Sequence, residues 1–355
     1  MTPDLGIIEG FFGRPYTWAE RASMVSALRP HGYGFYLYAP KADAYLRRDW
    51  RAPYPEAELR ALAAFAGHCR AAGVRFGVGL SPYELFLGFD AAGKTALAAK
   101  LAQLDSLGLN DLGVFFDDMR GDLPALAARQ VEIIHWIAER TTASRLIACP
   151  SYYTDDPVLD RVFGQRPANY LEDLGAALDP AIQLMWTGEE VCARAFSPGH
   201  LARVTEQMRR KPFLWDNYPV NDGPRMAPHL HLRAFTGRPA SISAHISGHA
   251  INTASQAVLS RIPALTLAES YRDGDAYQYG AAFRRAAAEV LGAGLAEAVE
   301  RNLLLLEDAG LPGMDAERKA RLRERFAAFD HAGAREIVAW LDGAWNAGTA
   351  ELQTQ

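Results

Sequence analysis

The sequence has little cysteine, no excess of positive charge and no long apolar run. Three cysteines in 355 residues are too few for a disulfide framework, and their spacing matches no paired metal site. The net charge of -5 argues against the basic character of a nucleic-acid-binding protein. The first residues lack the basic n-region of a signal peptide, and no apolar segment is long enough to span a membrane. These absences predict a cytoplasmic protein with no nucleic-acid or membrane partner.

Several catalytic motifs are also missing. The sequence contains no His-Glu-x-x-His or Cys-x-x-Cys pattern, no Gly-x-Ser-x-Gly elbow and no Walker-type phosphate loop. Two histidine pairs, 229 with 231 and 245 with 249, have a spacing that could bind a metal. Solvated or core-lining histidines are the favoured interpretation.

What the sequence does contain is a series of short apolar runs, about 30 to 40 residues apart. Alanine- and leucine-rich stretches with helical spacing lie between them. Eight strands that alternate with helices predict a parallel sheet closed as a (β/α)8 TIM barrel. The predicted strands are Leu5 to Phe11, Gly34 to Ala39, Arg75 to Leu80, Asp111 to Phe116, Arg145 to Cys149, Ala181 to Trp186, Lys211 to Trp215 and Ser241 to Ile246.

An open doubly wound sheet is the alternative fold. It would normally carry a glycine-rich phosphate turn after the first strand. The turn here reads Gly10-Phe11-Phe12-Gly13, with bulky aromatics where a phosphate needs close backbone approach. The barrel is therefore favoured.

The pattern changes near residue 255, after which amphipathic helical stretches follow one another with glycine and proline between them. We expect a barrel over residues 1–260 and a C-terminal helical region over residues 261–355 that packs on it. A large apolar face left uncovered on such helices usually marks a site for a partner. A homodimer that forms through these helices is therefore one hypothesis.

Two adjacent carboxylates, Asp117 and Asp118, follow the apolar run from Leu112 to Phe116. Placing acids beside a buried strand is costly, and the C-terminal mouth of a barrel is where enzymes accept that cost. Paired carboxylates there can divide acid and base roles when their environments separate their pKa values. The alternative is that one aspartate caps a helix and the other is solvated.

The other predicted strand ends are rich in Asp, Asn, Tyr and Trp. Carboxylates and amides bind hydroxyl groups in fixed directions, and aromatic faces can stack on a sugar ring. Asn217 and Asn221 could instead form ordinary turns, and Trp186 and Trp215 could be core aromatics. Together, the residues at the strand ends favour a carbohydrate-binding pocket.

Five of these strand-end segments resemble the catalytic domain of glycoside hydrolase family 84, which contains the O-GlcNAcases and bacterial β-N-acetylglucosaminidases. The resemblance covers residues 4 to about 260. It implies a retaining exo-β-N-acetylglucosaminidase in which the 2-acetamido oxygen of the substrate is the nucleophile, an exception to the usual two-carboxylate scheme. The segments are Gly-Ile-Ile-Glu-Gly-Phe-Phe-Gly-Arg-Pro-Tyr (6–16), Tyr-Ala-Pro-Lys-Ala-Asp (38–43), Phe-Phe-Asp-Asp-Met (115–119), Trp-Thr-Gly (186–188) and Trp-Asp-Asn-x-x-x-Asn-Asp (215–222).

The resemblance also implies roles for individual residues. Asp117 is expected to polarise the acetamido group, and Asp118 to be the general acid and base. It implies no metal and no organic cofactor. The residues expected to bind the sugar are Gly10 through its backbone, Lys41, Tyr153, Asn217, Asp222 and Asn252.

Two other functions stay open at this point. An inactive barrel could bind N-acetylglucosamine or a glycopeptide without hydrolysing it, since a fold does not guarantee activity. An endo-acting hyaluronidase is the second. The sequence indicates a substrate that bears N-acetylglucosamine. It does not show whether this substrate is a glycan or a glycoprotein.

Overall fold

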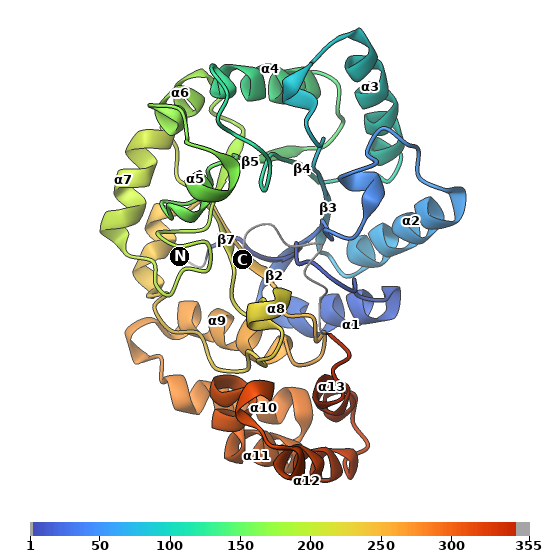
Figure 1. Cartoon of the computed structure of the whole chain (residues 1–355), viewed down its shortest axis with the longest axis vertical. Coiled ribbons are helices and arrows are strands. Elements are labelled where there is room, and N and C mark those ends of the chain that lie inside the picture. Colours follow the sequence, from blue (N-terminus) through green and yellow to red (C-terminus); the bar gives the residue numbers. More distant parts are fainter. Residues whose placement is uncertain (1–2, 346–355) are drawn as a thin grey trace.

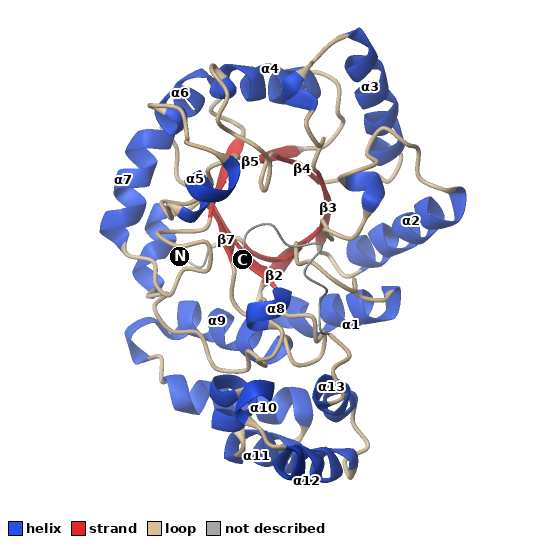
Figure 2. Ribbon diagram, in the orientation of Figure 1, coloured by secondary structure: helices blue, strands red, loops and turns tan. Residues whose placement is uncertain are grey.

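The structure is a computed structural model that describes residues 3–345. Its centre is a closed barrel of eight parallel strands in chain order, in which β1 also pairs with β8 (Figures 1 and 2). The (β/α)8 prediction is confirmed. The strands are β1 (Leu5–Glu9), β2 (Tyr33–Tyr38), β3 (Arg75–Leu80), β4 (Asp111–Phe115), β5 (Arg145–Cys149), β6 (Gln183–Trp186), β7 (Phe213–Asp216) and β8 (Gly248–Asn252).

Helices surround the barrel, as Figure 2 shows in blue around the red strands. Helix α1 begins with a capping box, in which Thr17 and Glu20 satisfy each other's backbone N–H groups. The helices around the barrel are α1 (Trp18–Leu28), α2 (Glu56–Ala71), α3 (Ala91–Asp105), α4 (Leu126–Ala138), α5 (Val158–Phe163), α6 (Tyr170–Ala177), α7 (Pro198–Met208), α8 (Gly223–Met226) and α9 (Arg261–Asp273).

The predicted eighth strand, Ser241 to Ile246, is wrong. Residues 241–245 of that segment belong to a 3-10 helix, Ala240–His245, and Ile246 follows it. The eighth strand is Gly248–Asn252. The 3-10 segment looked like a strand because its isoleucines are buried in the core. The true strand includes a fully buried histidine and a buried asparagine, so its sequence does not read as an apolar run.

Large aromatic side chains fill the barrel where neighbouring strands carry glycine. A Cβ atom added at Gly79 or Gly113 would overlap the ring of Phe115, and one added at Gly6 would overlap Phe35. The glycines therefore leave the space that these rings occupy. This pairing of large and small residues fills the barrel interior below its C-terminal mouth.

The N-terminal end of the barrel is closed by an ion-pair cluster. Arg145 of β5 donates two hydrogen bonds to Asp111 of β4, at 2.8 and 2.6 Å. It also donates to Asp4 at 2.7 Å, and Arg75 of β3 donates to Asp4 at 2.6 Å. Two arginines thus balance two aspartates, of which Asp111 is buried.

Beyond α9 the chain forms α10 (Tyr279–Leu291), α11 (Ala293–Arg301), a π-helix (Leu304–Ala309), α12 (Ala316–Ala327) and α13 (Ala332–Leu341), below α9 in Figure 1. These helices form hydrogen bonds with the loops that follow β7 and β8 at the C-terminal mouth of the barrel. Glu307 accepts from the N–H groups of residues 232–233, and Glu336 accepts from those of residues 258–259. The indole of Trp340 donates to the carbonyl that follows α8. The division at residue 260 stays a prediction.

Within residues 3–345, every helix is too short or too polar to cross a membrane.

Candidate active site

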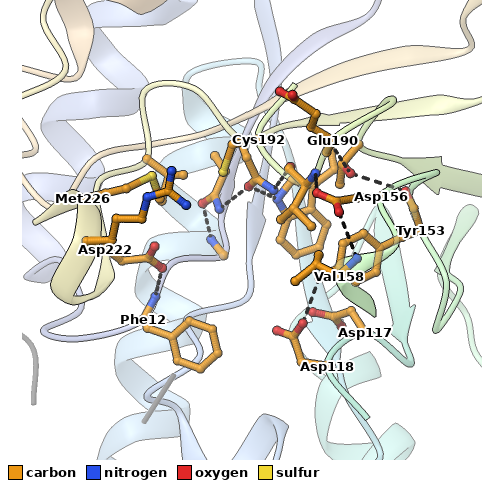
Figure 3. Close-up of a pocket in the computed structure, with 18 of the residues that line it drawn as sticks. Phe12, Asp117, Asp118, Tyr153, Asp156, Val158, Glu190, Cys192, Asp222 and Met226 are labelled. Atoms are coloured by element: carbon orange, nitrogen blue, oxygen red, sulfur yellow. Dashed lines mark hydrogen bonds between the residues drawn. The ribbon is translucent and has the colours of Figure 1, made fainter. Parts of the chain in front are cut away.

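A cavity of about 500 Å³ opens at the C-terminal ends of the barrel strands, which is within the usual size range of small-molecule sites. In Figure 3, Asp117 and Asp118 lie next to each other, and Asp222 lies across the cavity from them. The structure brings all eight predicted site residues to this one cavity. They are Gly10, Lys41, Asp117, Asp118, Tyr153, Asn217, Asp222 and Asn252.

The two adjacent aspartates reach the same cavity because β4 has ended before them. Successive residues of a strand point to opposite faces, so two neighbours could not both face the cavity from within it. Strand β4 ends at Phe115, and Asp118 has a left-handed backbone with φ of 56°. Both side chains are buried, Asp117 at 4% and Asp118 at 6% exposure. The backbone turn therefore gathers two carboxylates at one wall.

The environments of Asp117 and Asp118 differ in charge. Lys41 donates to Asp117 Oδ2, whereas its Nζ lies 3.8 Å from Asp118 Oδ2. Burial alone raises the pKa of Asp117, but the charges of Lys41 and Arg47 and the bond from Lys41 hold that pKa below its usual value. Burial and the charge of Asp117 outweigh these cations at Asp118, so the pKa of Asp118 is raised. Asp117 is thus favoured as the ionised member of the pair and Asp118 as the protonated one.

Tyr153, rather than its neighbour Tyr152, faces the cavity. Its hydroxyl donates to Asp118 Oδ1 at 2.9 Å. Tyr152 is fully buried and donates to the carbonyl of Gly164 at 2.5 Å, away from the cavity lining. Tyr153 is therefore the one of these two tyrosines that lines the cavity.

Two asparagines bind together at the base of the cavity. Asn217 Oδ1 accepts from Asn252 Nδ2 and from Trp215 Nε1, each at 2.9 Å. Asn217 Nδ2 donates to the carbonyl of Val191 at 2.8 Å, and Asn252 Oδ1 accepts from the N–H of Gly10 at 3.1 Å. These bonds join the ends of β1, β7 and β8 and the loop after β6. A Cβ atom at Gly10 would overlap the Trp215 ring, so only glycine fits there.

Asp222 precedes α8 on the far side of the cavity. Its Oδ2 accepts from the N–H of Phe12 at 2.7 Å, which ties the loops after β1 and β7 together. Burial raises the pKa of Asp222 to about 6. A carboxyl with this pKa titrates close to neutral pH.

A family model described as beta-N-acetylglucosaminidase matches residues 5–305. The chain belongs to this β-N-acetylglucosaminidase family. Membership confirms the resemblance to glycoside hydrolase family 84.

Known proteins similar to this β-N-acetylglucosaminidase family member include the protein O-GlcNAcases of Mus musculus and Rattus norvegicus. Each is 27% identical over 279 residues, which cover 75% of this chain and 30% of the relative. The chain thus matches less than a third of their length. A solved structure of a mutant Thermobaculum terrenum O-GlcNAc hydrolase has a TM-score of 0.79 and 25% identity, covering 95% of this chain and 80% of that one.

The sequence prediction for this family member missed three residues that support the site: Arg47, Asp216 and His249. Arg47 donates to the backbone of Asp118. Asp216 lies in the sequence between Trp215 and Asn217, which line the cavity. Its side chain is fully buried and accepts hydrogen bonds from Arg238 at 2.7 and 2.9 Å. His249 lies 3.0 Å from the same carboxylate. A polar residue within a strand or loop gives no sequence pattern that would reveal such a contact.

The two strand-end tryptophans have different environments. Trp215 lines the cavity, whereas Trp186 is fully buried and donates to His200 Nε2 at 2.9 Å. Only Trp215 can therefore contact a ligand. Cys149 and Cys192 also line the cavity, which the sequence analysis did not predict.

The histidine pairs form no metal site in the part of the chain that the structure describes, where no group of three or more potential ligands comes together. His229 Nδ1 lies 2.8 Å from the carbonyl of Glu307, and His231 Nδ1 lies 3.2 Å from that of Pro219. These histidines face backbone groups, which agrees with a structural role.

Proposed function

We propose that the chain is a retaining exo-β-N-acetylglucosaminidase that uses the 2-acetamido group of its substrate as the nucleophile. The glycosidic bond breaks as the acetamido oxygen attacks the anomeric carbon and forms an oxazoline, while an acid protonates the leaving oxygen. Water then attacks the anomeric carbon from the face that the aglycone left and displaces the acetamido oxygen, so two inversions retain the anomeric configuration. The substrate is an N-acetylglucosamine-bearing glycan or glycoprotein.

The observation that carries this proposal is the state of the Asp117 carboxylate. Its Oδ2 is bonded to Lys41, and its Oδ1 is buried with no hydrogen-bond partner among residues 3–345. A buried carboxylate oxygen without a donor is costly, and an amide N–H from a ligand would satisfy it. The acetamido N–H of the substrate is such a donor. A hydrogen bond from it to Asp117 would orient the acetamido oxygen and stabilise the positive charge of the oxazoline.

Asp118 has the properties of the partner acid. Its raised pKa favours the protonated form that the first step needs, while the lowered pKa of Asp117 favours the ionised form. After Asp118 has given its proton to the leaving oxygen, it can take one from water in the second step. The Tyr153 hydroxyl, which donates to Asp118, would steady the acetamido oxygen when substrate binds.

The remaining cavity residues would hold the sugar. Asp222, Lys41 and the Gly10 backbone carry charges or polar groups that bind hydroxyls. Asn217 would lie near the acetamido group, and the indole of Trp215 offers an aromatic face. Asn252 would bind a hydroxyl with its remaining amide hydrogen, since its oxygen already accepts from Gly10.

A substrate series with a progressively fluorinated acetyl methyl group tests the mechanism. Each fluorine makes the acetamido oxygen a poorer nucleophile, so kcat/KM on aryl N-acetylglucosaminides should fall steeply along the series. An enzyme whose nucleophile belongs to the protein would respond far less. Asp117→Ala should also weaken a cyclic oxazoline mimic, because transition-state analogues depend on such contacts.

A flat response to fluorination, or a glycosylated aspartate trapped by mass spectrometry, would overturn the mechanism. Two further outcomes would replace the function. Binding of N-acetylglucosamine without turnover at any pH from acid to mildly alkaline would indicate an inactive binding barrel. Loss of hyaluronan viscosity without release of a terminal sugar would indicate an endo-acting hyaluronidase.

A further inference from the structure

Arg47 ends a 3-10 turn (Ala44–Leu46) in the loop between β2 and α2. The same loop carries Lys41. The loop is anchored on both sides of the turn: the hydroxyls of Tyr38 and Tyr54 donate to Asp43 at 2.9 and 2.7 Å. The N–H that follows β3 also donates to the carbonyl of Leu46, at 2.7 Å. Arg47 is thus held in place by its own loop, and it is not part of the cavity lining.

Arg47 contacts the main chain of Asp118. Its Nη2 donates to the Asp118 carbonyl at 3.2 Å. Asp118 is one of five non-glycine residues in the described chain with positive φ, a sparsely populated conformation that persists only where the surroundings impose it. The guanidinium bond fixes the orientation of the Asp118 carbonyl. It is therefore one of the contacts that impose the turn by which both carboxylates reach the cavity.

Arg47 also brings charge to the pair. Its Nη1 is buried and has no hydrogen-bond partner within the described chain, so the guanidinium charge is only partly neutralised by hydrogen bonds. That charge lowers the pKa of Asp117 and opposes the rise of the pKa of Asp118. The other groups that face the two carboxylates are Lys41, Tyr153, Cys149 and Asp222.

We propose that Arg47 is a positioning residue for the general acid: it holds the left-handed backbone of Asp118 and places a fixed positive charge behind both aspartates. This inference rests on the proposed roles of Asp117 and Asp118. Arg47 acts through these residues and would not touch the substrate.

The test compares Arg47→Gln with Arg47→Lys on 4-methylumbelliferyl N-acetylglucosaminide across the pH range. Glutamine removes the charge, so the pKa values of both carboxyls should rise. Both limbs of the kcat/KM profile should then move upward by about 1 pH unit, the lower end of the effect of a nearby opposite charge. Arg47→Lys keeps the positive charge but loses the planar guanidinium group. Both limbs of its kcat/KM profile should therefore stay near those of the unaltered protein. In both variants kcat should fall by about 10- to 100-fold, as misplacement of a catalytic group does, with a smaller change in KM.

Arg70→Gln is the matched control. Arg70 of α2 also donates to backbone carbonyls, those of Leu107 and Gly108, and none of these three residues lines the cavity. This variant should keep the pH profile. A fall in activity of Arg47→Gln with both limbs unmoved would overturn the proposal, because a merely structural role lowers activity without shifting them.

A second measurement separates this inference from the proposed function. Carbon-13 NMR titration of the aspartate carboxyl groups reports the same two pKa values without turnover. If the unaltered protein releases no sugar, the proposed function fails, and the titration still decides the role of Arg47. Equal carboxyl titrations in the unaltered protein and Arg47→Gln would then contradict it.

Discussion

Both ends of the barrel carry aspartates and cationic side chains, but the hydrogen bonds of the aspartates differ between the two ends. At the N-terminal end, Arg75 and Arg145 balance Asp4 and Asp111 through short hydrogen bonds. At the C-terminal mouth, four aspartates and one glutamate line the cavity together with Lys41 and three arginines, and one oxygen of Asp117 has no hydrogen-bond partner in the described chain. At the N-terminal end the aspartates are bonded to arginines, whereas at the mouth a buried carboxylate oxygen is left for a ligand to satisfy. The comparison indicates that one end stabilises the fold and that the other offers groups to a ligand.

The largest expected effect is at the mouth. Asp118→Asn should leave sugar binding largely intact and remove general acid catalysis, which is worth about 10²- to 10⁴-fold in rate. Aryl substrates with good leaving groups need less protonation, so they should lose less than alkyl glycosides. Steady-state kinetics on both classes measures this difference. Equal losses on both would contradict the acid role of Asp118.

The next effect is at the opposite end. Arg145→Met should lower the free energy of unfolding by about 3 kcal/mol, because it leaves the buried Asp111 carboxylate without its main partner. Turnover per folded molecule should not change. Urea denaturation and active-site titration measure the two quantities. Arg140→Met is the control, since it breaks an exposed pair with Glu139 and should cost less than about 1 kcal/mol. Similar losses from both variants would remove the distinction between the ends.

Asp222→Ala sharpens the comparison within the mouth. If Asp222 accepts hydrogen bonds from sugar hydroxyls, the variant should lose about 1.5–3 kcal/mol of transition-state binding, the usual range for bonds to a charged group. The loss should appear in kcat/KM with the fold unchanged, as judged by circular dichroism. Kinetics close to those of the unaltered protein would give Asp222 a purely structural role.

The smallest effect concerns stability and pH. The pKa of Asp222 is about 6 in the folded protein and near 4 when the chain is unfolded. A raised pKa favours the folded state at low pH, and this contribution is lost as pH rises through 6. Relative to Asp222→Asn, the unaltered protein should therefore lose about 1 kcal/mol of stability between pH 5 and pH 8. Thermal unfolding of both proteins at the two pH values tests this sign. A gain in stability with rising pH would show that the carboxylate is favoured by its site.

The sequence was informative where periodicity or a motif carries the signal. Seven strands lie where their apolar runs predict them, because a parallel strand buried on both faces is apolar along its length. The eighth was misplaced, since His249 is buried within it and is satisfied by Asp216 and Tyr271, which are distant in sequence. Local composition does not encode such partners.

The candidate site shows the same limit. Its eight predicted residues follow strands in recognisable motifs, and the barrel brings the strand ends together. Arg47 follows no strand directly and lies in an irregular loop, so its contact with Asp118 depends on folded geometry. The left-handed backbone of Asp118 is equally invisible in the sequence, because aspartate adopts many conformations.

The hydrogen bonds from the C-terminal helices bear on how the chain can be shortened. The family match ends at residue 305, but Glu307, Glu336 and Trp340 all bind loops at the mouth. A chain cut at the end of the match would lose these groups and leave buried backbone N–H groups without acceptors. We expect the shortest fragment that keeps the mouth ordered to extend beyond Trp340. The family match therefore ends before the residues that hold these loops.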